Sequence, residues 1–100
     1  LAFSVMLAAG LEGIDKELEL PPPSASNVYD MTAAERNERE IQSLPGNLWE
    51  AISITENSEM VRDALGDLVF DSFIENKKIE WERYRSHVTD YEIMRYLPNL

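Results

Sequence analysis

Residues 64–97 read ALGDLVFDSFIENKKIEWERYRSHVTDYEIMRYL, and this stretch decides the fold class. Large side chains recur in it at steps of three and four residues, which predicts one amphipathic helix over roughly Asp67 to His87. That stripe consists of Phe70, Phe73, Ile74, Lys77, Trp81, Tyr84 and Val88. Thr89-Asp-Tyr-Glu92 is a capping box, so a new helix starts at Asp90, and Pro98 ends it. The stretch therefore predicts two consecutive helices.

Shorter helices precede this stretch, each with its own start signal. Thr32-Ala-Ala-Glu35 is another capping box, and Asn47 can cap a helix in which Leu48, Ile52 and Trp49 face inward. Asn57 or Ser58 can cap a third, which Gly66 interrupts. The predicted short helices are 33–39, 48–55 and 59–65.

The first fourteen residues, LAFSVMLAAGLEGI, are apolar on every side until Glu12. A helix that is hydrophobic all round is a buried one, and Gly13 marks its end. We expect its partner surfaces to lie in sequence beyond these 100 residues, because the chain opens in the middle of an apolar run. On its own, this helix would be exposed and prone to association.

A proline-containing connector follows, and no stretch shows convincing strand alternation. Pro21, Pro22 and Pro23 cannot continue a helix and favour extended geometry. The predicted fold class is mainly α with a Pro-rich loop. The predicted divisions are a buried helix 1–14, the loop 15–31, a helical region 32–87 and a C-terminal docking helix 88–100.

Charge and composition exclude several classes of function. The net charge is −10, from 19 acidic and 9 basic residues. Such an acidic chain repels phosphate backbones and anionic membranes, so neither nucleic acid nor membrane is an expected partner. With no cysteine, disulfides, thiol catalysis and cysteine-based zinc sites are excluded. The opening apolar run is too short to span a membrane and lacks the basic residues of a signal peptide.

No catalytic, cofactor-binding or metal-binding residue is predicted. The acidic pairs could ligate Mg²⁺ or Ca²⁺, but without EF-hand spacing or an accompanying histidine a solvated surface is favoured. Glu75 with Lys78, and Glu80 with Tyr84, are expected to be surface neighbours on a helix. The acidic pairs are Glu17 and Glu19, Glu38 and Glu40, Asp71 and Glu75, and Glu80 and Glu82.

Three other groups leave a functional and a structural interpretation open. His87, the single histidine, lies near a helix C-terminus, a position where the helix dipole favours cationic side chains in general; a structural role outweighs a catalytic one. Trp49 and Trp81 with Tyr84 could line a ligand pocket, although core or interface packing is the commoner use of such aromatics. The last helix concentrates large apolar groups at a chain end, and it could dock on its own fold or on a neighbouring subunit. Its candidate anchors are Tyr91, Ile93, Met94, Tyr96 and Leu97.

Four blocks, in the same order, resemble the C-terminal end of type I glutamine synthetase. They are LAFSVMLAAGLEGI, PPPSASNVYDM, LPGNLWEAI and the 64–97 stretch. Their similarity is strongest to the feedback-regulated bacterial and archaeal subgroup. The resemblance implies that the chain is the helical C-terminal part of an α+β catalytic domain.

The resemblance also implies an activity for the whole protein. It would be a cytoplasmic, ATP-dependent glutamate–ammonia ligase that forms glutamine with Mg²⁺ or Mn²⁺, assembled as a dodecamer of two hexameric rings. The family's catalytic and metal-binding residues lie upstream of this chain, and none maps onto it, so the 100 residues alone are expected to be inactive. The competing hypothesis is a non-enzymatic helical protein-interaction module.

Two regional roles follow from the resemblance. The family's C-terminal helix inserts into a subunit of the opposite ring, which makes 89–100 a predicted subunit interface. Tyr29 stands where one subgroup carries an adenylylated tyrosine, although Thr32 and Ala33 replace the prolines of that motif. The structural alternative for Tyr29 is a loop tyrosine packed on the core.

Overall fold

The computed structural model describes residues 1–99, and its regular structure over that range is helical throughout. The prediction of a mainly α chain is therefore confirmed. Leu100, the end of the predicted docking helix, lies outside the described residues. The elements are α1 (Ala2–Asp15), the 3-10 turn η1 (Val28–Asp30), α2 (Ala33–Glu38), α3 (Leu48–Glu56), α4 (Glu59–Leu65), α5 (Asp67–Arg85), α6 (Asp90–Tyr96) and the 3-10 turn η2 (Leu97–Asn99).

Side-chain caps set the starts of the short helices. Both predicted capping boxes form: the Thr32 hydroxyl accepts from the Glu35 backbone N–H at 3.2 Å, and the Thr89 hydroxyl accepts from that of Glu92 at 3.3 Å. Asn47 caps α3 as predicted. Of the two candidates for α4, Ser58 is the cap. Each cap satisfies an N–H that has no partner within its own helix.

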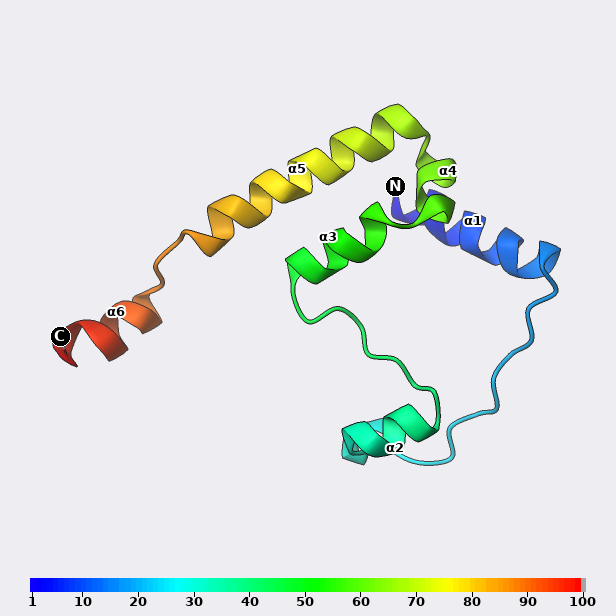
Figure 1. Cartoon of the computed structure of the whole chain (residues 1–100), viewed down its shortest axis with the longest axis horizontal. Coiled ribbons are helices and arrows are strands. Elements are labelled where there is room, and N and C mark those ends of the chain that lie inside the picture. The colour runs from blue at the N-terminus through cyan, green and yellow to red at the C-terminus, as the bar shows by residue number, and fades with distance from the viewer. Residues whose placement is uncertain (100) are drawn as a thin grey trace.

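The hydrophobic core lies between α3 and α5 and is closed at one end by α4. Ile52, Phe70 and Ile74 are buried, with Phe70 only 1% exposed. Partly buried side chains surround them: Leu48, Val61, Leu65, Phe73 and Trp81. We call α3, α4 and α5 together the α3–α5 unit (Figure 1).

The predicted stripe on α5 is buried over its first part only. Phe70 and Ile74 are buried, whereas Tyr84 is 69% exposed and Val88, beyond the helix, is 61% exposed. Helix α3 is nine residues long and α5 is nineteen, so the C-terminal part of α5 extends past its partner (Figure 1). The prediction that the helix reaches His87 was wrong by two residues, because α5 ends at Arg85.

The remaining elements make the molecule extended. Helix α1 packs on α4, while α2 lies apart from the other helices between two long loops (Figure 1). The radius of gyration is 18.9 Å, compared with about 13 Å for a compact chain of this length. Helix α6 lies at the far end of α5, and Pro98 lies within η2 rather than ending α6 directly as predicted.

Candidate functional site

A groove lies in the α3–α5 unit. Its volume is about 650 Å³, and its apolar floor includes Phe70 and Ile74. Charged side chains from all three helices line its walls: Glu56, Arg62, Asp71, Glu75, Lys78, Glu82 and Arg83.

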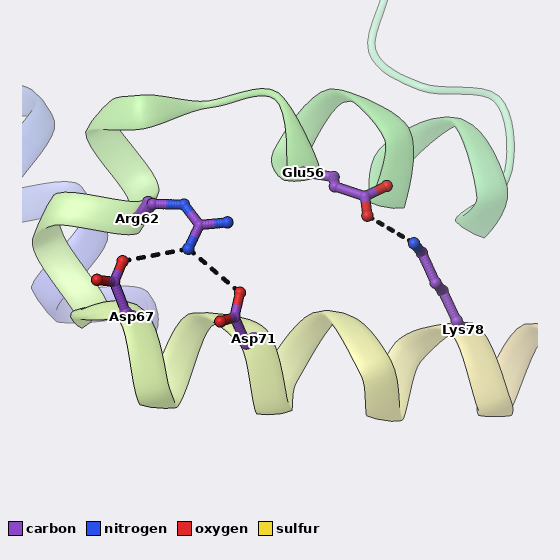
Figure 2. A network of polar contacts seen from close by, with 5 residues as sticks. All are labelled: Glu56, Arg62, Asp67, Asp71 and Lys78. Carbon is purple, nitrogen blue, oxygen red and sulfur yellow. Dashed lines mark hydrogen bonds and ion pairs between the residues drawn. The ribbon is translucent and has the colours of Figure 1, made fainter.

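Arg62 joins α4 to the start of α5 at one end of this groove. Figure 2 shows its guanidinium reaching two carboxylates one turn apart: Nη1 donates to Asp67 Oδ1 at 3.1 Å and to Asp71 Oδ1 at 3.2 Å. The same guanidinium lies 4.3 Å from the centre of the Phe70 ring, a cation–π distance. The hydrogen bond to Asp67 raises the pKa of Arg62 above its already high value, so this cation is permanent. Arg62 therefore links α4 to the first part of α5.

Lys78 closes the other side of the groove. Its Nζ donates to Glu56 Oε1 at 2.5 Å, which joins the last residue of α3 to the middle of α5 (Figure 2). Glu75 and Lys78 both lie on α5, as predicted for neighbours on one helix, and the ion pair of Lys78 is with Glu56. Glu80 and Tyr84 also lie on α5, and Glu80 forms an ion pair with Lys77 at 2.7 Å. Lys78 pairs with a residue of α3 rather than one of its own helix because α3 runs beside α5 at this point (Figure 1).

The groove combines an apolar floor with charged side chains on its walls. Asp71 and Glu56 are held in the ion pairs just described. Within residues 1–99, no three His, Cys, Asp or Glu side chains come together in a way that could hold a metal ion. This arrangement can therefore accept an apolar side chain and orient charged neighbours around it.

The aromatic trio lies outside the groove. The ring centres of Trp49 and Trp81 are 6.4 Å apart, and those of Trp81 and Tyr84 are 6.0 Å apart. Trp81 packs against the core, which agrees with the interpretation of these aromatics as core or interface groups. His87 lies in the exposed linker after α5, where its backbone N–H donates to the Tyr84 carbonyl at 3.1 Å.

The C-terminal segment forms an exposed arm. We call residues 89–99 the arm; its helix α6 packs mainly on η2, the turn that follows it. All five predicted anchors are exposed, from 44% for Ile93 to 78% for Met94. They are Tyr91, Ile93, Met94, Tyr96 and Leu97. The sequence left two alternatives open for the last helix: docking on its own fold or on a neighbouring subunit. In this structure the arm does not dock on its own fold.

Tyr29 is the other predicted site residue, and it lies in η1. Its side chain is 98% exposed, so the interpretation as a loop tyrosine packed on the core was wrong. The side chain of the preceding Asn27 accepts from the Tyr29 backbone N–H at 3.1 Å and donates to Asp30, which holds the turn. Met31, at 7% exposure, is the buried residue of this region instead.

Arg62 is the residue that sequence reasoning missed. It comes before a helix break at Gly66, so its partners cannot be read from the spacing within one helix. The available signal was the pair Asp67 and Asp71, four residues apart and thus on one face of α5. Two carboxylates on one face of a helix indicate that a cationic side chain from a neighbouring element lies close to them.

Among residues 1–99, no helix has the length and apolar character that crossing a membrane requires.

Comparison with known proteins points to the same family along almost the whole chain. Residues 1–96 match the family described as glutamine synthetase, catalytic domain. The chain is 50% identical over 97 residues to a glutamine synthetase of Mycolicibacterium smegmatis, 48% to one of Mycobacterium tuberculosis and 42% to one of Thermotoga maritima.

Each of these alignments covers 97% of the chain and 22% of the relative, so the chain spans about a fifth of the length of the proteins it matches. The match does not favour the alternative of a non-enzymatic interaction module. Four sequence blocks, a helical fold and a match over residues 1–96 agree, and the chain belongs to the glutamine synthetase family.

Proposed function

We propose that the whole protein is a glutamate–ammonia ligase and that this chain forms the C-terminal helical portion of its catalytic domain. The observation that carries the proposal is the match of residues 1–96 to the catalytic domain, with relatives 42–50% identical. Those relatives are named glutamine synthetase, and identity of this level along the full alignment supports the same activity here.

In the proposed reaction, ATP phosphorylates the side-chain carboxyl of glutamate, and ammonia displaces the phosphate to give glutamine. Divalent ions such as Mg²⁺ or Mn²⁺ would neutralise the charge of the transferred phosphoryl group. The described residues of this chain do not fit a metal site, since no cluster of ligands forms among them. The ATP, glutamate and metal sites are therefore assigned to the rest of the protein, which we expect to act in the cytoplasm.

The chain's own contribution is assembly. We propose that the arm docks on a subunit of the opposite ring in a dodecamer of two hexameric rings. In support, five large apolar side chains on the arm remain exposed, and a capping box shapes α6 before any partner arrives. Such preorganisation lowers the entropy that docking must overcome.

The test uses the full-length gene product with ATP, Mg²⁺, glutamate and ammonia. We expect glutamine formation, and a light-scattering mass that falls when residues 89–100 are deleted. A point variant, Met94→Glu, should also weaken assembly because it buries a charge in the docked arm. Its matched control is Tyr84→Ala, an exposed aromatic on α5 outside the arm, which should leave the mass unchanged. A folded full-length protein that makes no glutamine would rule out the activity, and an unchanged mass after the deletion would rule out the docking role.

We also propose Tyr29 as the residue to test for adenylylation, on the basis of its place in NVYDM and its 98% exposure. The replacement of the motif's prolines by Thr32 and Ala33 weighs against modification. Mass spectrometry of the native protein, from cells grown with scarce and with abundant nitrogen, would detect an adenylyl group on the peptide that contains Tyr29. An unmodified peptide under both conditions would discard this proposal.

A further inference from the structure

We draw no further inference here: the strongest candidate, the groove of the α3–α5 unit with its apolar floor of Phe70 and Ile74, carries none, because nothing in the structure shows what covers it.

Discussion

Replacing Phe70 with alanine should remove most of the stability of the α3–α5 unit. Phe70 is 1% exposed and is the largest fully buried side chain among residues 1–99. Truncation of a buried phenylalanine costs about 3–5 kcal/mol. The groove borders Phe70, so the surroundings can partly relax, which places the packing loss near the lower end of that range, about 3 kcal/mol.

The loss of the Arg62 contact adds to this figure. A guanidinium over an aromatic ring contributes about 0.5–1 kcal/mol at a partly exposed site, and here the distance to the ring centre is 4.3 Å. The total is about 3–4 kcal/mol. Domains have free energies of unfolding of about 5–15 kcal/mol, and a small core places this chain at the lower end. At a urea slope of about 1.5 kcal/mol per M, the midpoint should fall by about 2 M or more.

The assay is urea unfolding of the 100-residue chain, followed by circular dichroism and by tryptophan fluorescence. The chain's two tryptophans lie one on α3 and one on α5, with ring centres 6.4 Å apart, so their emission reports the packing of these helices. Tyr84→Ala on the same helix is the control, because Tyr84 is 69% exposed and should shift the midpoint little. Equal midpoints for the two variants would refute a core centred on Phe70.

Three further predictions concern local structure. Glu40→Gly should stabilise the chain to urea by about 0.5–1 kcal/mol, because residue 40 has φ 56°, a left-handed conformation that suits glycine; a lower midpoint would contradict this. Thr89→Ala removes the capping box and should destabilise α6 by about 1 kcal/mol. Backbone amides of residues 90–96 should then exchange hydrogen faster, whereas Thr89→Ser should keep their protection against exchange. The hydrogen bond to Glu12 raises the pKa of Lys16 in the folded chain. The stability that this hydrogen bond gives α1 is therefore fully present below the unfolded pKa of about 10.4, and it is lost as the pH rises through the higher folded pKa. Circular dichroism between pH 9 and 12 should show that loss as a fall in helix content. The Lys16→Gln variant should lack the part of this fall that comes from Lys16.

Local signals in the sequence predicted most of the helix boundaries because those signals act within a few residues. The Thr32 and Thr89 capping boxes, and the Asn47 cap, depend only on residues three positions away, and all of them form. The end of α5 was misjudged because the apolar pattern continues to Val88, whereas the partner helix α3 covers only the first part of α5. Periodicity alone carries no information about where a partner stops.

The ion pairs of the groove could not be predicted for a related reason. Lys78 has an acidic neighbour on its own helix, yet it pairs with Glu56, which lies 22 residues earlier. Arg62 reaches across the break at Gly66. Both contacts depend on how three helices fold against one another, and that arrangement is set by burial of Ile52, Phe70 and Ile74 rather than by local spacing. The exposure of Tyr29 escaped prediction too, because η1 turns Met31 inward in its place.

The order of elements in the α3–α5 unit has a kinetic consequence. Its three helices are consecutive and joined by one or two residues, so its contacts connect elements that are close neighbours in sequence. Chains of low contact order fold within microseconds to milliseconds. We therefore expect this unit to form early, while α1 and the arm still present their apolar side chains to water. During that interval, these two segments are the surfaces on which a chaperone or an incorrect partner would act.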